Sequence, residues 1–357
     1  MKYLRSQIYF ILFFGVFCGG DLLRAADPQL LRALFERDFR ANQGRFVPHR
    51  SLPNNSRIYD ENIHFVFITG FLSILETSYF QDQMDAIERM GVPSGRLHLI
   101  KPSSSNAIDQ GAKAIFERLR KMDGKFVLIA HSKGSAEVLE LALSHPDFIE
   151  EKVDDMFLLQ SAVKGSKLAT VAEAKNFDWT LLKGLSDADV AMAKRILFVA
   201  RNAPKRLFPK GFHSLSEDER NKSIDELLVE SQKAIPFITD KTHWMVSSIE
   251  EQDLMLYPQK DQTLWRVLKR LTGHDSDGML PVADQKIDEV GAVILTTSAG
   301  HSDFTNSSRS VLSADARRAL GISILTATET KRNLGHPQCP WAFGNLNRGA
   351  PLIIETK

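Results

Sequence analysis

The sequence has few cysteines, no excess of charge of either sign and few long apolar runs. Two cysteines in 357 residues exclude a disulfide-stabilised scaffold. The 45 lysines and arginines nearly balance the 44 aspartates and glutamates, so the net charge of +1 argues against nucleic acid as the main partner. A hydrophobic fraction of 43% and a charged fraction of 25% exclude a disordered chain, a collagen-like repeat and a polytopic membrane protein. The length permits one large domain or two small ones.

The strongest compositional bias lies in residues 1–26. Lys2 and Arg5 precede the apolar residues 8–17, and two alanines, Ala25 and Ala26, follow before the first acidic helix-like segment. Basic, apolar and small segments in this order are typical of a secretory signal peptide, and the apolar run is shorter than the about 20 residues of a spanning helix. We therefore expect export to the periplasm or to the outside of the cell. A buried N-terminal helix is the alternative.

The two cysteines bear on the fate of this segment. Cleavage near residue 26 removes Cys18 and leaves Cys339 as the lone cysteine. Lipid attachment at Cys18 is the weaker expectation, because the bulky Phe17 stands where a lipoprotein signal carries a small residue. Since a lone cysteine forms no internal disulfide, the exported protein would depend on its hydrophobic core.

Short, nearly continuous apolar runs recur from residue 62 onward. They are residues 63–69 (IHFVFIT), 96–101 (RLHLIK), 125–130 (KFVLIA), 155–160 (DMFLLQ), 243–248 (HWMVSS) and 291–297 (GAVILTT). Such runs are typical of strands buried on both faces of a sheet. Between them apolar residues recur with helical spacing, as at Ile108, Ala112 and Ile115. Strands alternating with helices predict an α/β fold with a mostly parallel central sheet flanked by helices.

The alternation of strands and helices stops at residues 164–241, which have helical patterns throughout. Two serines there, Ser186 and Ser216, each stand three positions before an acidic residue, the spacing of a capping box. We interpret this stretch as a helical cap or lid inserted into one α/β domain. The predicted parts are a signal peptide (1–26), an N-terminal helix and linker (27–61), the first part of the core (62–163), the cap (164–241), the second part of the core (242–310) and a C-terminal extension (311–357).

A candidate nucleophile lies where the third apolar run ends. The sequence there is Ala130-His131-Ser132-Lys133-Gly134, and a helical pattern follows. This segment resembles the nucleophile elbow of the α/β-hydrolases, G-x-S-x-G, with Ala130 in place of the first glycine. Small residues flank the serine because the turn from strand to helix is tight. The resemblance implies that Ser132 is the nucleophile, whereas the serine taken alone also suits a helix N-cap.

A histidine is needed to take the proton of the serine hydroxyl. The α/β-hydrolase order of serine, acid and histidine places it downstream. His301 follows the apolar run 291–297, in the loop where the family carries its histidine, and His336 is the competing base. His131 is adjacent to Ser132, where the elbow directs its side chain away from the nucleophile.

The acid is expected between the serine and the histidine. The stretch D-G-M-L-P-V at residues 277–282 resembles the D-G-x-V-P-V stretch of bacterial lipases and related esterases. On that resemblance Asp277 orients His301. Asp275 is the rival, two residues away, and both aspartates also suit a turn beside Gly278.

Ester hydrolysis also needs two N–H groups directed at the developing oxyanion. One is expected from the backbone of Lys133, directly after the nucleophile. Resemblance to the H-G-x loop of lipases assigns the other to Phe71, with Gly70 letting the backbone approach and Thr69 in place of the usual histidine. The mechanism needs no metal or organic cofactor, and neither the cysteines nor any His-x-x-x-His spacing suggests one.

These features in this order predict an exported serine hydrolase that cleaves carboxylic esters, resembling bacterial secreted lipases and esterases. The expected partner is a small-molecule or lipid ester. Four apolar residues of the predicted cap either line an acyl site and contact a lipid surface or form the insertion's own core: Phe208, Phe212, Leu227 and Leu228. Acyl transfer or thioester cleavage by the same triad, and a non-catalytic binding protein with a hydrolase fold, are the alternatives.

Overall fold

The computed structural model describes residues 28–42, 62–71, 73, 76, 78–174, 176–202, 207–305 and 310–334. The predicted signal peptide, most of the linker after it, Cys339 and His336 lie outside these residues. Within the described ranges, no helix has both the length and the apolar composition needed to cross a membrane.

One sheet of parallel strands forms the centre of the described structure. Its strands are β1 (Ile63–Ile68), β2 (Leu97–Ile100), β3 (Lys125–His131), β4 (Val153–Leu159), β5 (Thr242–Ser248) and β6 (Ala292–Ser298), in the order β2-β1-β3-β4-β5-β6. Every neighbouring pair is parallel. Each strand coincides with one of the apolar runs of the sequence, so the prediction of an α/β fold with a parallel central sheet is confirmed.

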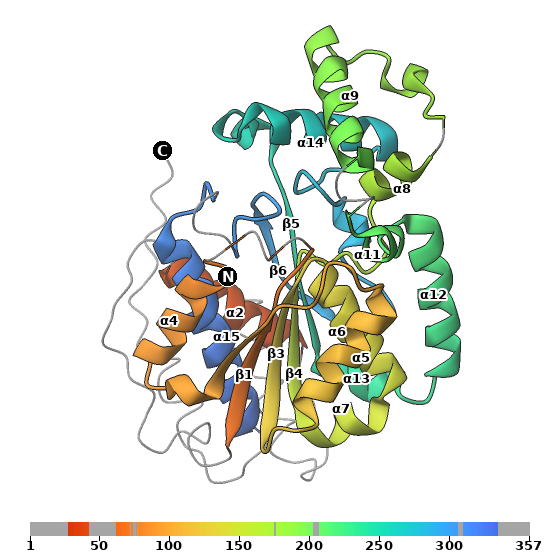
Figure 1. Ribbon diagram of the computed structural model, residues 1–357. Helices are drawn as coiled ribbons and strands as arrows, with labels where there is room; N and C mark the ends of the chain where they lie inside the picture. The colour runs from red at the N-terminus through yellow and green to blue at the C-terminus, as the bar shows by residue number, and fades with distance from the viewer. Residues whose placement is uncertain are drawn as a thin grey trace, which may run out of the picture.

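Helices cover both faces of the sheet (Figure 1). One face carries α2 (Pro28–Asn42), α4 (Gln81–Arg89) and α15 (Ala314–Leu334), and the other carries α5 (Ile108–Leu119), α6 (Lys133–Ser144), α7 (Pro146–Lys152) and α13 (Ile235–Lys241). The core between the sheet and α2, α4 and α15 is called the first core, and the core between the sheet and α5, α6, α7 and α13 is called the second core. Within β1, Phe65 and Phe67 belong to the first core, and Val66 and Ile68 belong to the second. The strands are continuously apolar because both of their faces are buried.

Most of the other helices lie beyond the carboxyl ends of the strands (Figure 1). They are α8 (Lys167–Glu173), α9 (Asp187–Asn202), α11 (Pro209–His213) and α14 (Gln259–Thr272), with the short 3-10 turns η3 (Trp179–Leu182) and η4 (Glu251–Leu256). Asp189 of α9 accepts hydrogen bonds from Thr263 and Arg266 of α14. The helices beyond the sheet therefore include α14, although it lies outside residues 164–241. The boundaries of the cap stay a prediction.

The helix α12 (Glu217–Glu230), also within residues 164–241, packs beside α6 instead. Its buried Arg220 places Nη1 2.6 Å from Glu140 Oε2 of α6 and donates from Nε to the carbonyl oxygen of Val163. Because a buried guanidinium is tolerated only with such partners, these contacts fix α12 against the second core.

The first and last described helices, α2 and α15, contribute to the first core. Phe35 and Phe39 of α2 and Leu325 of α15 are buried there, so the segments predicted as an N-terminal helix and a C-terminal extension each supply a helix to the sheet. The end of α15 is also tied to the amino ends of β4 and β5. Lys331 Nζ lies 2.6 Å from Asp155 Oδ1, and His243 Nε2 lies 2.8 Å from the same oxygen.

The two contacts to Asp155 outweigh the effect of its burial. Burial raises the pKa of the Asp155 carboxyl, but Lys331 and His243 together hold that pKa below its usual range. Burial lowers the pKa of His243, which keeps its imidazole neutral. A carboxylate whose folded-state pKa is lowered stabilises the fold above its unfolded pKa and loses that contribution as the pH falls through the folded value.

Asp155→Asn should lower the free energy of unfolding at neutral pH by about 3 kcal/mol, because Lys331 and His243 lose the carboxylate that they share. Urea unfolding of wild type and variant is the measurement, and the difference should shrink as the pH falls below about 3.9, the usual pKa of an aspartate, because the unfolded wild-type chain then takes up a proton that the folded carboxylate resists. Asp315→Asn, which removes an exposed ion pair with Arg318 on the same helix α15, is the control with an expected loss below about 0.5 kcal/mol. Equal losses in the two variants would contradict this account.

Candidate functional site

Ser132 occupies the turn between β3 and α6 in a backbone conformation rare for residues other than glycine. Its φ is 55° and its ψ is −124°. Two glycines make room for this turn beside the end of β1. A Cβ on Gly134 would lie 2.5 Å from the carbonyl oxygen of Thr69, and a Cβ on Gly70 would lie 2.9 Å from Ser132 Cβ. The tight crossing therefore places Ser132 at the carboxyl edge of the sheet.

His301 and Asp277 lie next to Ser132 in one hydrogen-bonded row. His301 Nε2 is 2.8 Å from Ser132 Oγ, and His301 Nδ1 is 2.8 Å from Asp277 Oδ2. Because a carboxylate only accepts hydrogen bonds, Nδ1 carries the proton and Nε2 is free to accept the proton of the serine hydroxyl. This arrangement can convert the hydroxyl into a nucleophile.

Asp277 is buried and held by its own loop. Its Oδ1 accepts hydrogen bonds from the backbone N–H groups of Met279 at 2.9 Å and Leu280 at 2.8 Å, and Gln285 Nε2 lies 3.4 Å from Oδ2. The backbone N–H of His301 also donates to the Asp277 carbonyl oxygen at 2.8 Å. The acid loop and the histidine loop are thus joined through both backbone and side chain.

The rival acid is placed differently. Asp275 has a side chain that is 58% exposed, and its Oδ1 lies 3.1 Å from Lys269 Nζ of α14. The rival base, His336, lies outside the described residues. Of the two aspartates, the structure brings Asp277 to the histidine and turns Asp275 toward a lysine.

The two N–H groups expected at an oxyanion site belong to the segments that cross at Ser132. Lys133 is the first residue of α6, where an N–H has no acceptor within the helix and where the helix dipole favours negative charge. Its side chain is buried in an ion pair with Glu137. Phe71 follows Gly70 at the end of the β1 segment, and the Gly70 N–H donates to Tyr79 Oη at 3.1 Å.

A cavity of about 750 Å³ opens beside Ser132 and His301. Its apolar wall includes Phe71, Ile196 of α9, Ile249, Leu256 of η4, Leu264 of α14 and Met279. Charged groups at Glu76, Lys260 and Asp261 also line it. The volume falls within the range of small-molecule sites, so the cavity can hold an organic substrate of moderate size.

The four cap residues considered from the sequence lie outside this lining. Phe212 is buried in the second core, and Leu227 and Leu228 of α12 pack against the same core. Phe208 and Phe212 meet the cavity only through Phe71, with ring centroids 5.9 and 6.3 Å from it. Phe212, Leu227 and Leu228 therefore pack into the core that the sheet shares with α5 and α6, neither lining the cavity nor forming a separate core of the insertion, and Ile196 and Leu264 belong to the apolar wall instead.

Sequence reasoning assigned no role to His131, which lies directly beneath the histidine loop. Its Nε2 is 2.7 Å from the carbonyl oxygen of His301, and the two rings have centroids 4.8 Å apart. Burial lowers the pKa of His131 well below its usual value, and the neighbouring His301 adds to this effect. In the sequence, the only sign of this role is a histidine at the end of an otherwise apolar buried strand.

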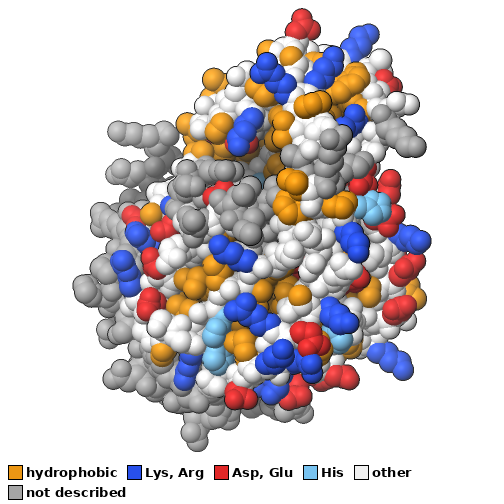
Figure 2. Space-filling model, in the orientation of Figure 1, with side chains coloured by type: hydrophobic (Ala, Val, Ile, Leu, Met, Phe, Trp, Pro, Cys, Tyr) orange, Lys and Arg blue, Asp and Glu red, His pale blue; other side chains and the backbone are white. Residues whose placement is uncertain are grey.

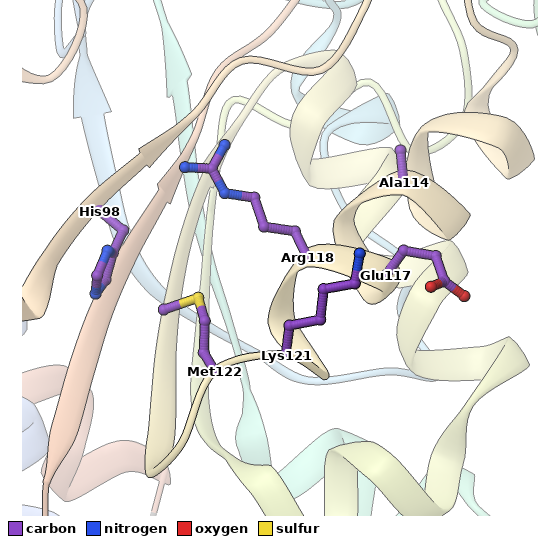
Figure 3. Close-up of a pocket in the computed structure, with 6 residues that line it drawn as sticks. All are labelled: His98, Ala114, Glu117, Arg118, Lys121 and Met122. Atoms are coloured by element: carbon purple, nitrogen blue, oxygen red, sulfur yellow. The ribbon is translucent and has the colours of Figure 1, made fainter.

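A second cavity, of about 520 Å³, lies beside β2 and α5 and shares no lining residue with the first (Figure 3). His98, Arg118, Lys121 and Met122 line it with Ala114 and Glu117. It lacks a nucleophile paired with a base, so the cavity at Ser132 is the candidate active site. Across the described ranges, no group of three or more histidine, cysteine, aspartate or glutamate side chains is arranged to hold a metal ion.

Comparison with known proteins identifies the fold. No protein-family model matches the sequence, and no curated protein does. A metagenomic carboxyl esterase is similar in structure, with a TM-score of 0.57 and 17% identity over 88% of this chain and 95% of that one. The mature lipase BlEst2 of Bacillus licheniformis matches with a TM-score of 0.46 and 12% identity over 74% of this chain and 91% of that one. Phospholipase PlaB of Legionella pneumophila matches with a TM-score of 0.41 and 13% identity over 63% of this chain and 45% of that one. The chain has the α/β-hydrolase fold, as its sequence predicts.

A fluorophosphonate probe should label Ser132, and Asp277→Asn should slow the labelling by about 10⁴-fold, because His301 then loses the tautomer that accepts the serine proton. Asp275→Asn is the matched control and should label at the wild-type rate within about twofold. Labelling rates are measured by mass spectrometry, with thermal unfolding of both variants to verify folding. Slow labelling of Asp275→Asn beside normal labelling of Asp277→Asn would reverse the assignment.

Proposed function

We propose that this protein is a serine hydrolase that cleaves carboxylic esters. Ser132 Oγ attacks the acyl carbonyl while His301 Nε2 takes its proton, and the N–H groups of Phe71 and Lys133 stabilise the oxyanion of the tetrahedral intermediate. The intermediate collapses as His301 returns the proton to the departing alcohol. Water activated by His301 then attacks the acyl-enzyme, releasing the acid and restoring Ser132. The row of 2.8 Å contacts from Ser132 through His301 to Asp277 carries this proposal.

The electrostatic role of Asp277 follows from its burial. Its carboxylate holds the proton on His301 Nδ1 and stabilises the imidazolium that forms when Ser132 loses its proton. Because Asp277 is almost fully removed from water, its interaction with the imidazolium is stronger than it would be in solvent. The proposed steps use side chains and backbone groups of the chain alone.

The similarity to a carboxyl esterase structure supports an ester as the substrate. The apolar wall of the cavity supports an ester with an apolar acyl group, since each methylene removed from water contributes about 0.8 kcal/mol to binding. We infer from these two observations that lipid esters are the substrate class. We also propose, from the composition of residues 1–26, that the enzyme is exported to the periplasm or beyond the cell.

Exposed apolar side chains gather around the cavity and support contact with a lipid surface. Leu256, Met279 and Val311 line the cavity and are exposed, and Met255 of η4 and Phe198 of α9 are exposed on neighbouring elements. In Figure 2 hydrophobic side chains are frequent over the part of the molecule where Figure 1 places α9 and α14. Exposed apolar groups concentrated beside a site are typical of interaction surfaces.

The wild-type chain should hydrolyse p-nitrophenyl esters, and Ser132→Ala should lower kcat by about 10⁵-fold because no other group can form the acyl-enzyme. Ser135→Ala, one helical turn away, is the control and should stay within about threefold of wild type.

Octanoate should be preferred to acetate by at least about tenfold in kcat/KM if the apolar wall binds the acyl chain. Equal rates for wild type and Ser132→Ala reject catalysis, and a preference for acetate rejects the lipid substrate.

Met255→Ser should lower the rate on esters presented in vesicles or emulsions by about fivefold, because a side chain that is 77% exposed beside the cavity loses its apolar contact with the lipid. Its rate on a soluble short-chain ester should not change. Val229→Ser on α12, equally exposed at 77%, is the matched control and should affect neither substrate. Equal losses in the two variants would show that general surface hydrophobicity, not this surface, supports the activity.

A further inference from the structure

A row of buried hydrogen bonds runs beneath Ser132 from the loop after β1 to the histidine loop. The Gly70 N–H lies 3.1 Å from Tyr79 Oη, and Tyr79 Oη lies 2.6 Å from His131 Nδ1. On the other side of the same ring, His131 Nε2 lies 2.7 Å from the carbonyl oxygen of His301. Three contacts therefore connect the oxyanion segment to the proposed catalytic base.

The direction of each bond in this row is determined by its two ends. A carbonyl oxygen only accepts, so His131 Nε2 must donate its proton to His301. In a neutral imidazole Nδ1 is then an acceptor, and it takes the hydroxyl proton of Tyr79. Tyr79 Oη in turn accepts the Gly70 N–H. All the bonds fit one tautomer of His131, so the row is internally consistent.

Burial keeps both side chains in the protonation states that these bonds require. Burial raises the pKa of Tyr79 to about 12, and it lowers the pKa of His131 well below its usual value. Both groups are therefore neutral at physiological pH. His131 faces Tyr79, Gln160 and His301, so the group that gains charge beside it during the proposed reaction is His301 itself.

Gln160 extends the row to the strands on the other side. Its Oε1 lies 3.2 Å from His131 Nε2, and its Nε2 donates to the carbonyl oxygen of Gly300 at 2.8 Å and to Ser247 Oγ at 2.6 Å. The two consecutive carbonyl groups of Gly300 and His301 thus both accept hydrogen bonds, from Gln160 and His131 respectively. The histidine loop is fixed at its backbone, independently of the contact between His301 and Asp277.

Unfavourable backbone conformations gather along this row. Among the residues that the structure describes, positive φ values outside glycine occur at Asn62, Phe80, Ser132 and Gln160. Phe80 directly follows Tyr79, and Ser132 directly follows His131. Such conformations persist where the surrounding contacts determine them, and they concentrate at functional sites. Three of these four residues, Phe80, Ser132 and Gln160, therefore lie in the row or directly beside it.

We propose that Tyr79 and His131 are positioning residues that couple the oxyanion segment to His301. Tyr79 orients the peptide that precedes the Phe71 N–H, and His131 holds the His301 backbone so that the imidazole stays on Ser132 Oγ. This inference rests on the proposed function. A merely structural pair would stabilise the fold, whereas a positioning pair changes the geometry on which the transition state depends.

Tyr79→Phe should lower kcat by about tenfold and His131→Phe by about 100-fold, each with KM changed less than about twofold, because the oxyanion and the imidazolium form only in the transition state. His131→Gln should recover kcat to within about fivefold of wild type, since its amide can donate to His301 and accept from Tyr79. The double variant Tyr79→Phe/His131→Phe should match His131→Phe alone, because His131→Phe already removes the contact through which Tyr79 acts on His301.

Thr328→Val is the matched control, since it removes a buried hydroxyl hydrogen bond within α15. It should lower Tm as much as Tyr79→Phe and leave kcat unchanged. The coupling is wrong if Tyr79→Phe lowers Tm alone, if its effect falls on KM, or if the losses of the two single variants multiply in the double variant. The first result assigns the pair to stability, the second assigns it to substrate binding, and the third gives the two residues independent roles.

A second measurement needs no substrate. The ¹⁵N spectrum of the wild-type histidines should show His131 neutral, with its proton on Nε2, at every pH from about 5.5 to 8. A proton on Nδ1, or titration in this range, would falsify the row itself. A wild type that has this tautomer but cleaves no ester rejects the proposed function and leaves the row intact, whereas an active wild type with unchanged kcat in Tyr79→Phe rejects the coupling.

Discussion

The backbone of Ser132 is the constraint around which the site is built. A serine at a φ of 55° between β3 and α6 requires the end of β1 to pass against the turn with no side chain in between, and Gly70 and Gly134 meet that requirement. The same crossing brings the amide at the start of α6 and the segment of Phe71 to one point. The cavity, His301 and Asp277 are then arranged around an atom whose position the turn has already determined.

Two layers of hydrogen bonds hold His301 at this point. The upper layer joins His301 to Asp277 through side chain and backbone, and the lower layer supports the His301 carbonyl through His131. A neutral imidazole suits the lower position, because a second positive charge there would oppose the imidazolium of His301 that the proposed reaction forms. Burial lowers the pKa of His131 and so preserves Nδ1 as the acceptor of the Tyr79 hydroxyl.

The roof of the cavity joins segments that are far apart in the chain. Ile196 comes from α9, whereas Leu256 and Leu264 come from η4 and α14, which lie between β5 and the acid. Asp189, bonded to Thr263 and Arg266, ties these segments together. The long stretch before Asp277 thus lines the cavity beside Ser132 and His301. Exposed apolar residues on η4 continue the same surface outward.

The strands, their parallel arrangement and the turn at Ser132 can be predicted from the sequence, because continuous apolar runs and small residues beside a serine are local requirements of a buried strand and a tight turn. The sequence also placed His301 and the pair of candidate acids in order along the chain. Tertiary structure decided which aspartate faces the histidine, since Asp275 and Asp277 share one motif and differ only in which one the loop buries. It likewise decided that α14 covers the cavity, that α15 belongs to the core and that His131 supports His301. These outcomes depend on partners many residues away, whose burial and hydrogen bonding no local pattern encodes.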